Sequence, residues 1–216
     1  MMNMKTALFS ALLLLPSFAV QSDTSGTVAL SSDYFWRGIS QNAGNPALSL
    51  GYEIKDNGFY AGIWGSQVDY GDETSIEYDL YAGYALAITD DLSVTGGMIQ
   101  YNWDTNLDIL VDGHGQNTHE QYEEVFAKAR YKTMSVAYYV ETNDSDKHYF
   151  EASYGLPFIT VVDVKVGYAE WYYGDKHASV TVSKDLGDYN LGIMVMDGAR
   201  HGDPFDMAAV TVAYNF

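Results

Sequence analysis

The feature that most constrains this chain is an alternation of apolar and polar residues with a period of two. It recurs from about residue 27 to the end. In the run 76–88, for example, Ile76, Tyr78 and Leu80 lie on one side, and Glu77 and Asp79 on the other. Successive side chains of a strand point to opposite faces, so this pattern predicts strands. The sequence therefore predicts an all-β protein.

The alternating runs can be divided into strands at the polar and glycine-containing breaks between them. We predict twelve strands, at residues 26–37, 46–55, 58–68, 76–88, 92–103, 121–131, 134–142, 147–155, 159–171, 177–185, 188–196 and 207–216.

The connections between these strands are alternately short and long. Short turns occur at 56–57, 89–91, 132–133, 156–158 and around Gly187, and the intervening connections are longer and polar. Long strands joined in this way are typical of outer-membrane β-barrels, whereas sandwich strands are shorter and lack this asymmetry. In lipid a sheet must close so that every backbone group is paired. We therefore predict a transmembrane antiparallel β-barrel with periplasmic turns and termini and extracellular loops.

The two ends of the chain fit this interpretation. Residues 1–19 contain Lys5, an apolar run and small residues before a cleavage point, which predicts a removable signal peptide. Residues 20–216 are then a single barrel domain in the outer membrane of a Gram-negative bacterium. The last strand ends at Phe216, which we expect at the membrane edge. It also resembles the C-terminal signal that the outer-membrane assembly machinery reads, so we expect that machinery and outer-membrane lipid as partners.

Composition excludes several other classes of protein. The formal net charge is −18, with only 11 Lys and Arg residues, which argues against nucleic-acid binding. There is no cysteine, and hence no disulfide framework or thiol chemistry. After the signal, no apolar run is long enough for a membrane-spanning helix. We expect no cofactor, and the sequence does not indicate an oligomeric state.

The first third of the exported chain contains a set of residues that points to a known family. The stretches "SSDYFWRGISQNAGNPALSLGYE" and "NGFYAGIWGSQVDYGD" resemble the TorF family of predicted porins. This resemblance implies an outer-membrane barrel through which solutes pass, and it supplies no catalytic residue. The matching positions are Asp33, Tyr34, Arg37, Gly38, Ser40, Gln41, Gly58, Tyr60, Gly62, Trp64 and Ser66.

The face opposite the apolar one carries charges, which we interpret as pore-lining. They could form a selectivity filter, or a salt-bridge network that only neutralises buried charge. Because acids outnumber bases, we expect a preference for cations. The candidate pore-lining residues are Asp33, Arg37, Glu53, Glu77, Asp79, Glu124, Lys128, Arg130, Glu141, Glu151, Asp163 and Lys165.

Other candidate sites are weaker. The loop 105–120 contains Asp108, Asp112, His114, His119 and Glu120, but their spacing matches no metal motif, so we interpret it as a solvated external loop and predict no metal. No Gly-x-Ser-x-Gly motif is present, and we predict that the protein is not an enzyme. The aromatic residues near strand ends could stack a solute, but we assign them to membrane girdles. They are Tyr101, Trp103, Trp171, Tyr172 and Tyr173.

The predicted strand number leaves two functions open. Barrels of about eight strands are filled by side chains, and those of sixteen to eighteen leave an aqueous channel. Twelve strands allow a narrow pore, so we predict passive diffusion of small solutes or ions. The alternative is a non-conducting barrel with a structural, surface or adhesion role.

Overall fold

The computed structural model describes residues 23–105, 121–172 and 174–216. The predicted signal peptide at 1–19 and most of the loop 105–120 lie outside these described residues. The strands are β1 (Asp23–Ser31), β2 (Phe35–Trp36), β3 (Ile39–Ser40), β4 (Ala47–Asp56), β5 (Phe59–Gln67), β6 (Ile76–Ala87), β7 (Leu92–Trp103), β8 (Tyr122–Tyr131), β9 (Met134–Glu141), β10 (His148–Gly155), β11 (Asp163–Trp171), β12 (Lys176–Leu186), β13 (Tyr189–Arg200) and β14 (Asp203–Asn215).

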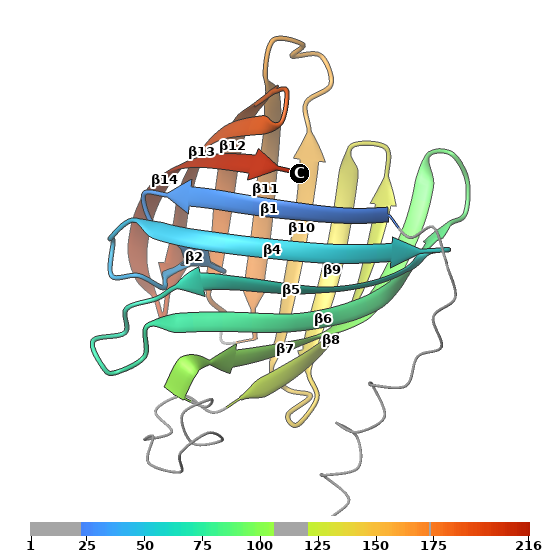
Figure 1. Cartoon of the computed structure of the whole chain (residues 1–216). Helices are drawn as coiled ribbons and strands as arrows, with labels where there is room; N and C mark the ends of the chain where they lie inside the picture. Colours follow the sequence, from blue (N-terminus) through green and yellow to red (C-terminus); the bar gives the residue numbers. More distant parts are fainter. Residues whose placement is uncertain (1–22, 106–120, 173) are drawn as a thin grey trace, which may run out of the picture.

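Twelve of the strands in the described part of the chain form one closed antiparallel barrel, as predicted (Figure 1). Each long strand pairs with its neighbours in sequence, and β1 closes the ring by pairing with β14. The closing seam extends to the end of the chain. The backbone N–H of Gly26 donates to the carbonyl of Phe216 at 2.7 Å, and the N–H of Phe216 donates back at 3.0 Å. Among the described residues, no helix is long and apolar enough to cross a membrane.

Tight turns at one end of the barrel follow from the local sequence. Asn57 and Gly58 join β4 to β5 with φ angles of 49° and 88°. Two successive positive φ angles are those of a type I′ turn, for which Asn-Gly is favoured because its twist matches the strands. His201 and Gly202 form a similar turn with φ angles of 51° and 90°, although it lies at the opposite, loop end. The sequence predicted a long connection, 197–206, between the strands 188–196 and 207–216. That prediction is wrong, since β13 continues to Arg200 and β14 begins at Asp203.

Two other predicted boundaries are also wrong. The predicted strand 26–37 leaves the barrel wall after Ser31. The predicted strand 159–171 begins only at Asp163, because the connection from β10 occupies 156–162 rather than 156–158. In both cases apolar residues next to a strand extend the alternation without joining the ladder.

The outer face of the barrel is apolar over its whole circumference. Large hydrophobic side chains such as Leu50, Ile63, Leu86 and Val212 are each about half exposed. Their partners in the alternation point inward, for example Glu77 and Asp79 from β6. A continuous apolar belt around a closed sheet is suited to lipid and not to water. The fold is therefore that of a bacterial outer-membrane barrel.

Exposed aromatic side chains gather on the outer face at the turn end of the barrel. Such rings are favoured at the membrane interface. Phe216 belongs to this girdle and packs its ring over Gly26, where a Cβ atom would collide with it. Phe216 also stacks on Tyr214, with ring centroids 5.9 Å apart. The girdle includes Phe59, Tyr84, Tyr131, Tyr154, Tyr189, Tyr214 and Phe216.

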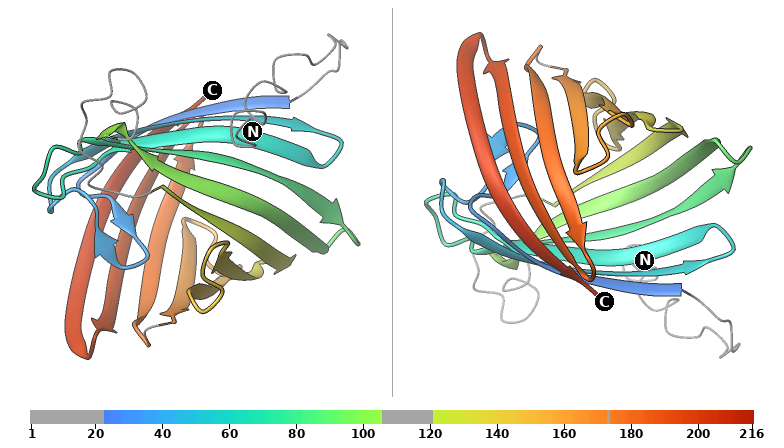
Figure 2. Two further views of the ribbon diagram at one scale, coloured as in Figure 1. Left: turned by 90° about the horizontal axis from the view of Figure 1, so that it is seen from below. Right: turned by 90° about the horizontal axis from the view of Figure 1, so that it is seen from above.

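The segment between β1 and β4 folds into the barrel. Its strands β2 and β3 form a small separate hairpin, and in both views of Figure 2 these short blue strands lie within the ring of long strands. Asp33 and Arg37, predicted on the inner face of the first strand, are instead carried by this inward-folded segment. The reason is the turn at Arg37 and Gly38, where positive φ angles of 50° and 81° end the extended backbone.

The lipid contact of the outer face can be tested at Ile193, which is 48% exposed near the middle of β13. Ile193→Arg should lower the free energy of unfolding in lipid vesicles by about 2–4 kcal/mol, as for arginine at the bilayer midplane. Leu186→Arg, on the same face at the turn end, is the control and should lower it by only about 0–1 kcal/mol. Urea titration followed by tryptophan fluorescence measures both. Equal small losses would mean that water, not lipid, surrounds Ile193.

Candidate functional site

The inward-folded hairpin, residues 32–46, places an arginine inside the lumen, toward the loop end. Trp36 and Ile39 pair across its tip, and the two residues between them have the positive φ angles of a type I′ turn. A Cβ atom on Gly38 would lie 3.1 Å from both the His177 ring and the Phe205 ring. Glycine at this position therefore satisfies the backbone conformation and also lets the tip approach the opposite wall.

Arg37 forms a bidentate ion pair with Glu124 of β8. Its Nη1 and Nη2 donate to Glu124 Oε1 and Oε2 at 2.7 and 2.5 Å. The two side chains are only 9% and 5% exposed. Tyr101 also donates its hydroxyl to Glu124 Oε2, at 3.1 Å. A buried carboxylate with two parallel N–H donors is among the strong charge-assisted arrangements, and it fixes the hairpin tip to the wall.

Aromatic rings surround the same guanidinium. Its Cζ atom lies 4.2 Å from the ring centroid of Tyr149, 4.9 Å from that of Tyr139 and 6.0 Å from that of Trp171. Trp36, on the hairpin itself, is 4.7 Å away. We call Glu124, Tyr139, Tyr149 and Trp171 the Arg37 cage.

The cage keeps the guanidinium charged. Burial opposes the charge, but the hydrogen bonds to Glu124 and the charge interactions outweigh it and raise the pKa of Arg37 above its ordinary value. Attraction between the cation and the ring faces adds to the ion pair.

A second set of contacts holds the base of the hairpin. Tyr34 donates its hydroxyl to Glu77 Oε1 at 3.1 Å, and the Tyr70 hydroxyl lies 3.0 Å from Glu77 Oε2 and 2.9 Å from Gln41 Oε1. Burial, together with the nearby Glu77 carboxylate, raises the pKa of both tyrosines, so their hydroxyls keep their protons and act as donors. Ser40 donates to Asp33 at 2.9 Å within the segment.

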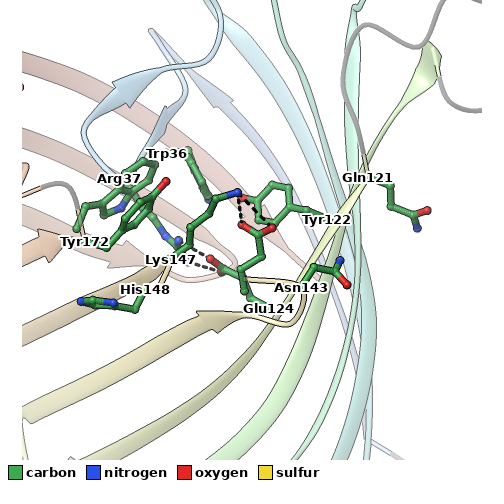
Figure 3. Close-up of a pocket in the computed structure, with 11 residues that line it drawn as sticks. Trp36, Arg37, Gln121, Tyr122, Glu124, Asn143, Lys147, His148 and Tyr172 are labelled. Atoms are coloured by element: carbon green, nitrogen blue, oxygen red, sulfur yellow. Dashed lines mark hydrogen bonds and ion pairs between the residues drawn. The ribbon is translucent and has the colours of Figure 1, made fainter. Parts of the chain in front are cut away.

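Cavities lie on both sides of the Arg37 cage. The outer cavity, about 400 Å³, opens at the loop end and is lined by Trp36, Arg37, Glu124, Lys147 and Trp171, among others (Figure 3). The inner cavity is about 120 Å³ and is lined by Tyr149 and by polar residues of β8 to β12. Tyr149 borders the inner cavity and packs on Arg37, which lines the outer cavity, so the Arg37 cage lies between the two cavities.

The structure brings the predicted pore-lining residues into several groups. Arg37 pairs with Glu124, and Glu77 and Asp79 are buried beneath the hairpin base. Glu141 pairs with Lys147 at 3.2 Å beside the outer cavity. Lys128, Glu151 and Lys165 line the inner cavity.

Three further predicted residues lie near the turn end. Glu53 pairs with Lys55 at 2.6 Å, and Arg130 donates to the Lys132 carbonyl at 3.2 Å. Asp163 is exposed at the start of β11.

Three of the aromatic residues assigned to membrane girdles lie inside the barrel instead, so that assignment is wrong for them. Tyr101 and Trp103 are buried, and Trp171 is part of the Arg37 cage. Their positions in the alternation place them on the inner face. Sequence reasoning did not name Tyr34, Tyr139 or Tyr149 as pore-lining residues. Tyr34 was among the positions that resemble the TorF family, and Tyr139 and Tyr149 share the inward parity of Glu141 and Glu151.

The weaker metal hypothesis is not addressed by the structure. Asp108, Asp112, His114, His119 and Glu120 lie outside the described residues, as does Tyr173. Within the described ranges, no group of three or more His, Asp or Glu side chains could hold a metal ion.

Several solved structures have a similar fold, including the following three. The KdgM porin in complex with disordered oligogalacturonate aligns over 90% of this chain and 99% of its own, with 12% identity and a TM-score of 0.61. A structure from a study of the in-meso crystallization of membrane proteins aligns over 89% and 83%, with 11% identity and a TM-score of 0.57. OprD from Pseudomonas aeruginosa aligns over 93% and 68%, with 13% identity and a TM-score of 0.45. At these identities the first two similarities establish the fold and no more.

The sequence has a clear family assignment as well. No curated protein matches it. Residues 19–212, nearly the whole chain, match the family described as "Bacterial protein of unknown function (Gcw_chp)". The chain therefore belongs to the Gcw_chp family of bacterial proteins.

Proposed function

We propose that the protein is an outer-membrane channel for passive diffusion of small solutes, with the inward-folded hairpin as its constriction. The observation that carries this proposal is the position of Arg37 and Glu124 between two lumen cavities. Twelve strands enclose more space than an eight-stranded barrel, which side chains alone would fill. The resemblance of the hairpin residues to the TorF family of predicted porins supports the same function, and membership of that family stays a prediction.

We further propose that the channel prefers cations. The candidate lumen residues comprise eight acids and four bases. Lys55 and Lys147, which pair with Glu53 and Glu141, bring the bases to six, so acids still exceed bases. Low-dielectric walls focus the remaining negative field and enrich cations in the lumen. Glu77 and Asp79 are buried under the hairpin base, so we assign the preference to Glu141 and Glu151, which border the cavities.

The same charge balance argues against extending the ligand of the KdgM porin to this protein. The structure of KdgM contains an oligogalacturonate, in which each sugar unit carries a carboxylate group. A lumen with excess acidic side chains repels such a polyanion, so we do not extend that ligand to this chain.

A non-conducting barrel is the second candidate. Two sets of contacts tie the hairpin to the wall, at its tip through Glu124 and at its base through Glu77. A segment held at both ends could act as a plug, with the barrel serving a structural or surface role. Conductance in a planar bilayer separates the two candidates.

Selectivity gives the sharper test of the channel. Glu141→Gln with Glu151→Gln should lower the cation-to-anion permeability ratio several-fold, since a charge about 4 Å from a passing ion contributes roughly 1 kcal/mol even in water. The reversal potential under a salt gradient measures the ratio. Asp72→Asn with Glu73→Gln, on an exposed loop, is the control and should change it less because salt screens exposed charges. Anion preference in the unmodified protein would contradict the charge assignment, and absence of conductance would favour the plug.

A further inference from the structure

The wall side of the Arg37 cage is complete without the hairpin. Glu124, Tyr139, Tyr149 and Trp171 come from β8, β9, β10 and β11, four successive strands of the wall. Tyr101 from β7 adds a hydroxyl donor to the carboxylate. The guanidinium that fills the cage is supplied by a different element, the tip of a hairpin that takes no part in the barrel ladder.

The cage can be approached through the lumen. Glu124 and Trp171 line the outer cavity, which opens at the loop end (Figure 3), while Tyr149 lines the inner cavity. A solute that enters the outer cavity therefore meets the carboxylate and the first ring of the cage before it can go further.

The geometry of the cage selects one kind of cation. A guanidinium is planar, so it can donate two parallel N–H groups to one carboxylate while its faces lie against aromatic rings. Arg37 does both, with its two donors on Glu124 and its Cζ atom 4.2 Å from the Tyr149 ring. An ammonium group is a compact, strongly hydrated charge and cannot make both contacts in this arrangement.

We propose that the Arg37 cage is a binding site for solutes that carry a guanidinium group, and that Arg37 occupies it as an internal ligand. This rests on the proposed channel function and names its solute class. An incoming guanidinium exchanges with Arg37, so the Glu124 carboxylate stays paired throughout. Once Arg37 is released, the hairpin remains held at its base, where Tyr34 donates to Glu77 and Tyr70 to Gln41, and by the packing of Trp36 on Tyr101. The constriction therefore widens at the tip as the solute binds.

The internal ligand should mask the site in the unmodified protein. A group tethered within the same molecule has an effective concentration in the millimolar range or above. Removing the internal ligand by Arg37→Ala leaves the Glu124 carboxylate buried without its cation. Because an unpaired buried charge is costly, the empty cage should bind a cation from solution.

The test uses the full-length barrel folded in detergent micelles, with methylguanidinium and methylammonium as probes. Fluorescence of Trp36 and Trp171, which flank the site, reports binding. Arg37→Ala should bind methylguanidinium at least about tenfold more tightly than the unmodified protein does and about tenfold more tightly than it binds methylammonium, reflecting the loss of an internal competitor and the bidentate contact. Arg37→Ala with Glu124→Gln should abolish this difference between the probes.

Folding of each variant is checked by its heat-dependent migration on a denaturing gel. If Arg37→Ala does not fold, Arg37→Lys, which retains a positive charge for Glu124, is titrated in its place and should show the same preference. A folded variant that binds both probes equally, or no better than the unmodified protein, overturns the proposal. The measurement needs no conductance, so a cage that binds methylguanidinium in a barrel that does not conduct would reject the channel and retain the binding site.

Discussion

Replacing residues 33–45 by a short Gly-rich turn should raise single-channel conductance several-fold. Ser31 of β1 and Ala47 of β4 are paired neighbours, so a tight hairpin turn can join the two strands without disturbing the wall. The replaced segment carries β2, β3 and Arg37, which occupy the lumen between the two cavities. Removing it widens the narrowest part of the channel.

The comparison with the unmodified protein identifies the role of the hairpin. Current through both proteins, larger after replacement, is the result expected for a constriction. Current only after replacement would mean that the hairpin is a plug. No current through either would reject the channel and leave the structural barrel. The control shortens the exposed connection at 71–73, which lines neither cavity and should leave the conductance nearly unchanged.

Glu124→Leu should lower the free energy of unfolding by about 3–5 kcal/mol, the loss expected when one partner of a buried ion pair is removed. It leaves the Arg37 guanidinium, which is 9% exposed, without its bidentate partner. Changing both residues, with Arg37→Met and Glu124→Leu, should recover most of this loss, because apolar side chains of similar volume avoid the buried charge altogether. Urea titration followed by tryptophan fluorescence measures the whole cycle.

An exposed ion pair provides the matched control. Lys132 and Asp91 lie 3.6 Å apart at the turn end, with side chains 58% and 54% exposed. Asp91→Leu should change the free energy of unfolding by no more than about 1 kcal/mol, as exposed pairs do. A loss at Glu124 no larger than that at Asp91 would mean that the hairpin tip is not firmly held, and it would also weaken the case for a constriction at this position.

The sequence by itself was sufficient to predict the barrel wall. Strand formation, and the face to which each side chain points, depend on a local property. In a pleated strand successive side chains point to opposite faces, so the pattern of apolar and polar residues can be followed in the sequence. This is why β6 and β7 begin where predicted and why Glu77 and Asp79 point inward. The closing role of Phe216 was predictable for a related reason, since a sheet in lipid cannot leave an unpaired edge.

The candidate site was only partly predictable. Arg37 and Glu124 were both named as lumen residues, but their pairing joins positions 87 residues apart. The alternation continues through Phe35 and Trp36 and so favours a longer first strand, whereas the chain turns at Arg37 and Gly38 with positive φ. The Arg-Gly dipeptide was the one local signal for that turn. Whether the segment then folds into the lumen or extends outside depends on which groups of the opposite wall can bind Arg37. These groups are the carboxylate of Glu124 and the rings of Tyr139, Tyr149 and Trp171. Those four groups become neighbours when β8 to β11 pair. The hairpin follows β1 and faces them only when the barrel closes, and for that physical reason only the tertiary structure decides that the hairpin lies across the lumen.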